Sequence, residues 1–164
     1  MARATQIVSL ALAFAAAAGP AAASDSFCDP LIRAVAAAPA FVSLRGAMTG
    51  SEFDGNLIIW EADQCNIRNK SPELATPLDS PQARWSYECL YEMRTPEALG
   101  ALQSLIASCL PDARYQAGSQ FRNEPGGANY DGGIFTIGAN RIAIDFNKTT
   151  NSVWMIILPP GVNY

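Results

Sequence analysis

Residues 84–111, RWSYECLYEMRTPEALGALQSLIASCLP, decide the fold because the spacing of apolar side chains changes within them. The first half alternates, and one face carries Trp85, Tyr87, Cys89, Tyr91 and Met93. The other face carries Ser86, Glu88 and Glu92. A period of two is typical of a strand with one buried face, so we expect a strand over residues 85–93.

The second half of this stretch predicts a helix that follows Thr95 and stops at Pro111. Thr95 is a good N-cap, and Pro96 suits the first helical position. Apolar residues then recur at helical spacing, at Leu99, Leu102, Leu105, Ile106, Cys109 and Leu110. Strand and helix therefore each have an apolar face that another element must cover.

Residues 1–23 have the features of a secretory signal peptide. Arg3 provides a positive charge, residues 7–18 form an apolar run, and residues 21–23 resemble a small-residue cleavage site. The apolar run is shorter than the ~20 residues that span a bilayer, and an uncleaved anchor is the less favoured alternative. We therefore expect a periplasmic or secreted product, residues 24–164, which folds as a single domain without a membrane span.

Four cysteines in an oxidising compartment predict two disulfides. None of them has the Cys-x-x-Cys spacing of a zinc or redox site. Cys28 begins the first expected helix and Cys109 ends the second, so antiparallel helices on one sheet face would bring them together. Cys65 follows a strand expected to neighbour that of Cys89. We therefore expect the pairs Cys28–Cys109 and Cys65–Cys89.

The other expected elements follow from spacing and from helix and turn signals. A first helix begins at residues 29–30 and ends before Pro39. Strands are expected over residues 41–45, 57–62, 85–93, 134–137, 141–147 and 153–158. Residues 63–67 either extend the second strand or turn away from it. Residues 68–83 contain three prolines and residues 112–133 contain five glycines, so both are expected to be loops.

These elements predict an α+β fold: an antiparallel sheet of five to six strands with two helices packed on one face. The last strand should be central, because both of its faces are apolar. The element order over residues 26–158 resembles the type III secretion chaperone-like fold. This resemblance rests on the order of the elements, without a shared residue motif, and implies a protein-binding or inhibitor-like role.

The composition argues against several classes of function. The chain has no histidine, which removes Ser-His-Asp and Cys-His nucleophiles and His-based zinc sites. Its net charge of −4 argues against nucleic acid as a partner. The glycines of residues 123–133 do not follow the G-x-G-x-x-G order of a phosphate cradle. We therefore expect no catalytic set, no metal and no cofactor.

Two groups of residues remain as candidate sites. Phe121, Arg122 and Tyr130 lie in the expected loop, and aromatic and Arg side chains on loops are typical anchors of protein interfaces. The simpler interpretation is that Phe121 and Tyr130 attach the loop to the core. Glu61 and Asp63 could act as the carboxylate pair of a glycoside hydrolase, although a solvated strand end explains them as well.

The sequence thus predicts a non-enzymatic protein-binding module, inhibitor-like or chaperone-like, whose partner is another protein of the cell envelope or extracellular space. A small cell-envelope hydrolase that uses Glu61 and Asp63 is the alternative.

Overall fold

A computed structural model describes residues 21–49, 52–70, 84–119, 121 and 127–162. Its helices are α1 (Ala21–Ala36) and α2 (Pro96–Cys109), with short 3₁₀ turns at Val42–Leu44 and Gly127–Asn129. Its strands are β1 (Arg45–Thr49), β2 (Glu52–Gly55), β3 (Gln64–Asn69), β4 (Trp85–Tyr91), β5 (Arg114–Ala117), β6 (Tyr130–Ile137), β7 (Asn140–Asn147) and β8 (Ser152–Leu158).

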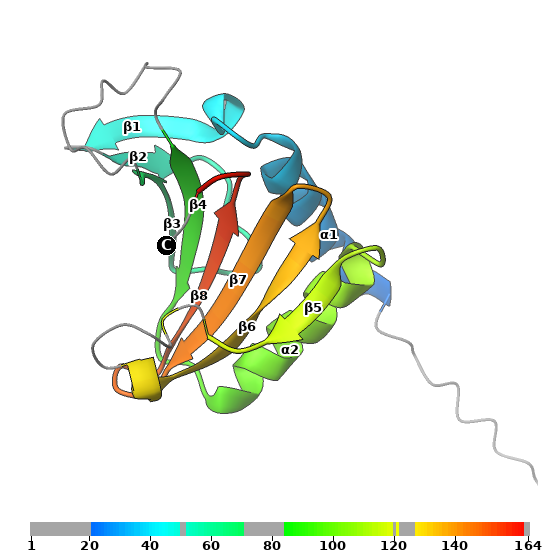
Figure 1. The fold of residues 1–164 in the computed structure, drawn as a ribbon. Helices are drawn as coiled ribbons and strands as arrows, with labels where there is room; N and C mark the ends of the chain where they lie inside the picture. Colours follow the sequence, from blue (N-terminus) through cyan, green and yellow to red (C-terminus); the bar gives the residue numbers. More distant parts are fainter. Residues whose placement is uncertain (1–20, 50–51, 71–83, 120, 122–126, 163–164) are drawn as a thin grey trace, which may run out of the picture.

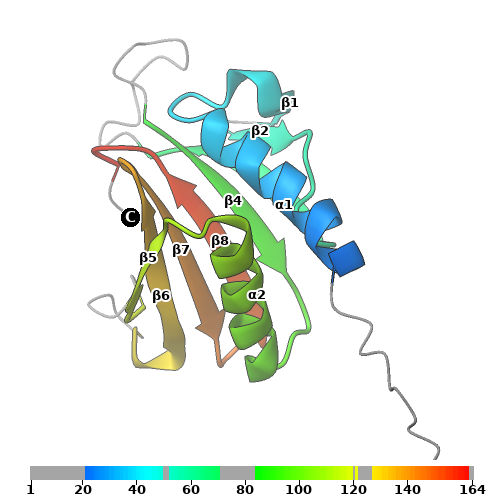
Figure 2. The same cartoon turned by 90° about the vertical axis from the view of Figure 1, so that its right-hand side faces the viewer.

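All of these strands form one antiparallel sheet in the order β1-β2-β3-β4-β8-β7-β6-β5. In the described part of the chain, each half supplies an α-helix followed by four strands, and the last strands of the two halves, β4 and β8, pair in the middle (Figure 1). Figure 2 shows both helices on the same face of the sheet. As predicted, β8 is central, and most of its side chains are buried.

The expected sheet of five to six strands is wrong, because the residues that the structure describes form a sheet of eight strands. Strands β1 and β2 lie almost entirely between the expected strands of residues 41–45 and 57–62, where no strand was expected, and β5 forms inside the expected loop of residues 112–133. Strand β6 also begins earlier, at Tyr130. Since β1 and β5 are edge strands with mostly exposed side chains, they need no alternating apolar pattern.

The first half of the sheet also follows a different path from the expected one. Phe41 has a positive φ of 51° and precedes a 3₁₀ turn, so residues 41–44 are not a strand and only Arg45 of the expected segment belongs to β1. Positive φ values of 47° at Trp60 and 55° at Glu61 place a turn within residues 57–62. The undecided residues 63–67 belong mostly to β3, which begins at Gln64 and is therefore separate from residues 57–62.

Helix α2 has the predicted start and stop, and Leu102 and Ile106 are its buried residues. Helix α1 begins earlier than expected, and Pro30 lies inside it. Of the expected signal peptide, residues 1–20 lie outside the described part, and residues 21–23 belong to α1. Neither helix, as described, has the length and apolar character needed to cross a membrane.

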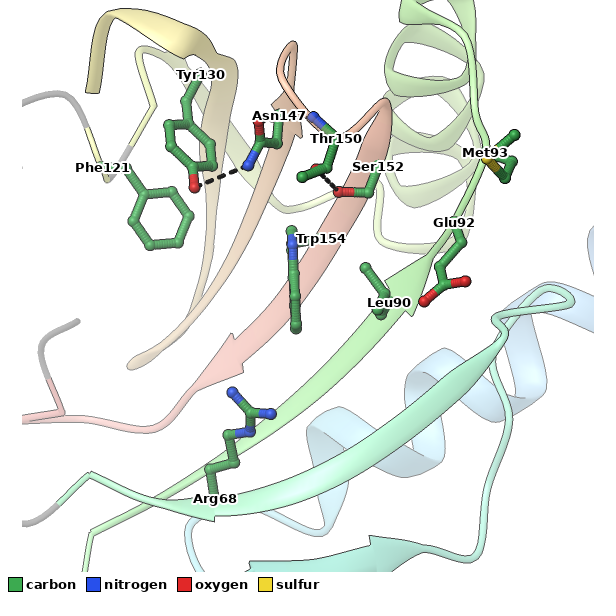
Figure 3. Close-up of a pocket in the computed structure, with 10 residues that line it drawn as sticks. All are labelled: Arg68, Leu90, Glu92, Met93, Phe121, Tyr130, Asn147, Thr150, Ser152 and Trp154. Carbon is green, nitrogen blue, oxygen red and sulfur yellow. Dashed lines mark hydrogen bonds between the residues drawn. The ribbon is translucent and has the colours of Figure 1, made fainter. Parts of the chain in front are cut away.

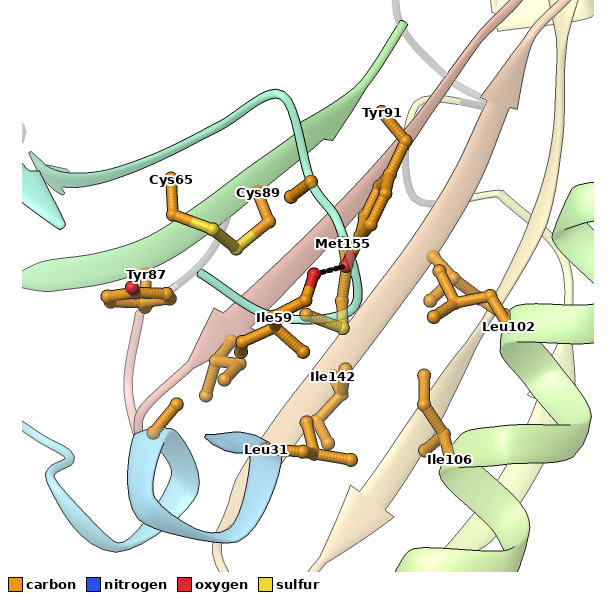
Figure 4. Close-up of a cluster of buried hydrophobic side chains, with 14 of the residues drawn as sticks. Leu31, Ile59, Cys65, Tyr87, Cys89, Tyr91, Leu102, Ile106, Ile142 and Met155 are labelled. Atoms are coloured by element: carbon orange, nitrogen blue, oxygen red, sulfur yellow. Dashed lines mark hydrogen bonds between the residues drawn. A yellow bond between two sulfur atoms is a disulfide. The ribbon is translucent and has the colours of Figure 1, made fainter. Parts of the chain in front are cut away.

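The core lies between the helices and the sheet (Figure 4). It includes Leu31, Ile59, Tyr87, Leu102, Ile106, Ile142 and Met155. Burial of such side chains stabilises the folded state by ~25 cal/mol for each Å² of apolar surface that is removed from water. Met93 was expected on the same face as Tyr91, but its side chain is 85% exposed because the strand ends at Tyr91.

Two disulfides strengthen this core, and they join the residues paired in the sequence analysis. Cys28 is bonded to Cys109 and links the two helices, with 5.1 Å between their Cα atoms. Cys65 and Cys89 are bonded across directly opposite positions of β3 and β4. The helices are not antiparallel, since both rise from the lower to the upper part of Figure 2. The first pair meets because Cys109, the last residue of α2, lies beside the middle of α1, where Cys28 is located.

Candidate functional site

The face of the sheet that points away from the helices is hollowed near its centre (Figure 3). The cavity volume is about 440 Å³, and we call it the sheet hollow. Its lining residues come from β3, β4, β6, β7, β8 and the adjoining loops: Arg68, Leu90, Glu92, Met93, Phe121, Tyr130, Asn147, Thr150, Ser152 and Trp154. Such a volume is within the ~300–1,000 Å³ that is common for ligand sites.

Aromatic side chains line one side of the sheet hollow. The rings of Phe121 and Tyr130 pack with their centroids 4.6 Å apart. Asn147 Nδ2 donates a hydrogen bond of 3.0 Å to the Tyr130 hydroxyl. Trp154 is half-buried on β8 and packs with Phe121 against a second cluster of buried residues, Ala143, Ile156, Leu158 and Val162. Packing holds these rings in place before any ligand arrives, which lowers the entropy cost of binding.

Arg68 forms another side of the sheet hollow, and ion pairs hold it in position. Its Nε atom lies 3.1 Å from Glu52 Oε1, and its Nη1 atom lies 3.5 Å from Glu88 Oε2. Its guanidinium lies 5.8 Å from the ring centre of Trp154, within the range of a cation–π contact. The positive charge of Arg68 is therefore balanced by the carboxylates of Glu52 and Glu88, which lie on the neighbouring strands β2 and β4.

Glu88 is a buried charge beneath this site. Its carboxylate was expected on the solvent side of the strand, but the residue is only 2% exposed. Lys70 Nζ lies 2.8 Å from Glu88 Oε1, and the Ser86 hydroxyl donates a 2.7 Å hydrogen bond to the same oxygen. Lys70 and Arg68 thus compensate and cover a charge that would be costly to bury alone.

Polar side chains lie at the end of the sheet hollow that is farthest from Arg68 (Figure 3). The hydroxyls of Thr150 and Ser152 are 2.7 Å apart, which satisfies one hydrogen bond between them. The backbone N–H of Glu92 donates to Asp63 Oδ2 at 2.7 Å, while the side chain of Glu92 is exposed. Met93 extends from the rim beside it.

The structure brings together part of the site expected from sequence. Phe121 and Tyr130 contact each other and both line the sheet hollow, whereas Arg122 lies outside the described residues. Sequence reasoning missed Arg68, Leu90 and Trp154. Apolar side chains on the second face of β4 and β8 were the signal that could have revealed Leu90 and Trp154.

Glu61 and Asp63 have a different setting. Both are exposed, and neither lines the sheet hollow. Arg94 Nη2 lies 3.8 Å from Asp63 Oδ2 and donates a 3.3 Å hydrogen bond to the backbone carbonyl of Glu61. These contacts attach the turn after residue 59 to the segment that leads into α2, which gives both residues a structural role.

In the described part of the chain, no three His, Cys, Asp or Glu residues are grouped closely enough to hold a metal ion. Comparisons with protein-family models, curated proteins and solved structures give no match. The geometry of the sheet hollow is therefore the basis for the functional proposal.

Proposed function

We propose that this protein is a non-enzymatic protein-binding module, and that the sheet hollow receives part of its partner. The observation that carries this proposal is the gathering of Trp154, Tyr130, Phe121 and Arg68 around one cavity. Trp, Tyr and Arg are the residue types that most often dominate binding energy at protein interfaces. Inhibitor-like or chaperone-like binding to another protein is consistent with such a surface.

The compartment is part of the same proposal. Two disulfides and the signal-like residues 1–23 support a periplasmic or secreted protein. Disulfides persist where the surroundings are oxidising, so the partner would be a protein of the envelope or the extracellular space. The acidic net charge does not favour nucleic acid.

A hydrolase is the less supported alternative. General acid–base hydrolysis of a glycoside needs two carboxyl groups on either side of the scissile bond. Among the described residues, the sheet hollow has one lining carboxylate, Glu92, because Glu88 is buried and ion-paired beneath Arg68. The pair Glu61 and Asp63 lies outside this cavity.

Position-specific photo-crosslinking tests the proposal. A photoreactive amino acid replaces Met93, which is 85% exposed at the rim of the sheet hollow. The matched control replaces Met48, which is 58% exposed on the edge strand β1. We expect a discrete crosslinked product with a second protein in the native envelope from position 93 and none from position 48. Equal products from both positions, or none from position 93, would contradict the proposal.

A further inference from the structure

The charged side chains that line the sheet hollow differ in whether a nearby opposite charge neutralises them. Arg68 and Glu92 are its charged lining residues among those described. Arg68 lies within 3.5 Å of the carboxylates of both Glu52 and Glu88. The exposed side chain of Glu92, by contrast, makes no ion pair with a described residue, since it is the backbone N–H that contacts Asp63.

A second carboxylate, that of Asp63, adds to the negative charge of Glu92 at the rim of the sheet hollow. Asp63 Oδ2 lies 2.7 Å from the backbone nitrogen of Glu92, which places a second carboxylate close to the rim. The nearest cation to Asp63 in the ion pairs of the described residues is Arg94, at 3.8 Å. Its single positive charge balances one of the two carboxylates, Asp63 and Glu92, and leaves one negative charge. An incoming ligand therefore meets net negative charge at the Glu92 end, which favours a cationic group there.

The rest of the sheet hollow suits an apolar group. Leu90, Trp154 and Phe121 contribute apolar surface, and Met93 adds a flexible thioether at the rim. The nearby polar side chains already bond one another, Tyr130 with Asn147 and Thr150 with Ser152. A sugar would have to replace these bonds with its own, whereas an apolar side chain leaves them intact.

We infer that the occupant is a peptide segment of the partner that carries a large apolar side chain close to a Lys or Arg. The apolar side chain packs against Trp154 and Leu90, and the cation pairs with Glu92. This inference rests on the proposed function and adds the chemistry of the partner. It predicts that binding depends on both contacts and weakens as salt increases, because the ion pair at the exposed Glu92 is screened.

A library of short random peptides displayed on phage, selected on the immobilised full chain, provides the probe. We expect the selected peptides to combine Phe, Leu or Met with a nearby Lys or Arg. One selected peptide is then synthesised and its Kd is measured for variants. Trp154→Ala should weaken binding by at least about 30-fold, the effect of a hot-spot residue. Met93→Ala, at an exposed position that carries little risk to folding, should weaken it by a smaller factor.

Charge reversal tests the ionic contact. Glu92→Lys should weaken binding by about 3- to 10-fold, because an exposed ion pair is replaced by repulsion. Asp112→Lys, at an exposed position that does not line the sheet hollow, should change the Kd by less than about 2-fold. The same selection on the Glu92→Lys variant should enrich Asp and Glu in place of Lys and Arg.

Several results would overturn the inference. These are selection of peptides without basic residues, equal effects of Glu92→Lys and Asp112→Lys, or no selected peptide at all. A glycan that competes with the selected peptide would also overturn it, because the occupant would then be a sugar. If the crosslink from position 93 is still observed in any of these cases, protein binding stands and only the chemistry of the anchor is wrong. Loss of that crosslink as well would contradict both.

Discussion

Leu90 and Trp154 lie directly opposite each other on the central strands β4 and β8, and both side chains line the sheet hollow. Their neighbours Cys89 and Met155 are also opposite each other and belong to the core on the helix side. The same strand pair therefore supplies the core with one face and the candidate binding site with the other. Because β4 and β8 come from different halves of the chain, the sheet hollow forms only when the two halves pair.

Glu88 should be more important for stability than the other carboxylate that contacts Arg68. Glu88→Gln leaves Lys70 and Arg68 without their buried counter-charge, and we expect a loss of about 2–4 kcal/mol in the free energy of unfolding. Glu52→Gln is the matched control, because the Glu52 side chain is 38% exposed and should cost less than about 1 kcal/mol. Urea denaturation measures both, and equal losses would show that burial of Glu88 has no energetic consequence.

The disulfides should stabilise the chain to different extents. Cys28 and Cys109 are 81 residues apart in sequence, whereas Cys65 and Cys89 are 24 apart. In the chain-entropy model, the longer loop contributes ~4.5 kcal/mol and the shorter ~3.5 kcal/mol. Replacing each pair by Ala and measuring denaturant unfolding tests this order. A greater loss from the 65–89 pair would show that packing around those buried sulfurs outweighs loop entropy.

Two buried tyrosines should make the fold sensitive to alkali. Burial raises the pKa of Tyr87 to about 12, and burial also raises the pKa of Tyr91. In the unfolded chain a tyrosine ionises near pH ~10. The unfolded state therefore loses its proton first, so stability is complete below pH ~10 and falls as pH rises toward ~12.

The Tyr91 hydroxyl donates to the carbonyl of Ile59 at 2.9 Å, and the Tyr87 hydroxyl donates to that of Leu57. The variant Tyr87→Phe loses one of these bonds, at a cost of about 1 kcal/mol at pH 7. It should also lose less stability than the parent chain between pH ~9 and ~11. Thermal unfolding across this range is the measurement, and parallel pH curves for the two proteins would contradict the role of Tyr87.

Sequence periodicity predicted the elements with long apolar patterns. Helix α2 and strands β4, β7 and β8 lie close to their expected bounds, because each buries a continuous apolar stripe. The short strands β1, β2 and β5 were missed because each has only four or five residues and none of their side chains is fully buried, so they carry no continuous apolar stripe. Arg68 was assigned to a loop for a different reason, because the prolines downstream of it dominated the local pattern.

The candidate site was only partly predictable. Phe121 and Tyr130 stand out as aromatic residues in a glycine-rich stretch, so composition alone revealed them. Their proximity to Arg68 and Trp154 depends on the strand order β3-β4-β8-β7-β6, which no local pattern encodes. The burial of Glu88 could not be predicted from the alternation of residues along its strand. It depends on Arg68 of β3 and on Lys70, which follows β3, because these two cations cover the carboxylate.

Two glycines should respond oppositely to replacement by alanine. Gly100 lies inside α2, and a Cβ atom there would meet no other atom within 4 Å. Gly100→Ala should raise the free energy of unfolding by about 0.5–1 kcal/mol, because alanine loses less backbone entropy in a helix. At Gly132 of β6, a Cβ atom would overlap the backbone carbonyl oxygen of Ile144 on β7. Since backbone atoms of a paired strand cannot move aside without breaking the ladder, Gly132→Ala should lower stability by about 2 kcal/mol or more. Denaturant unfolding of both variants tests the pair, and a stabilised Gly132→Ala protein would show that β6 and β7 are not packed this closely.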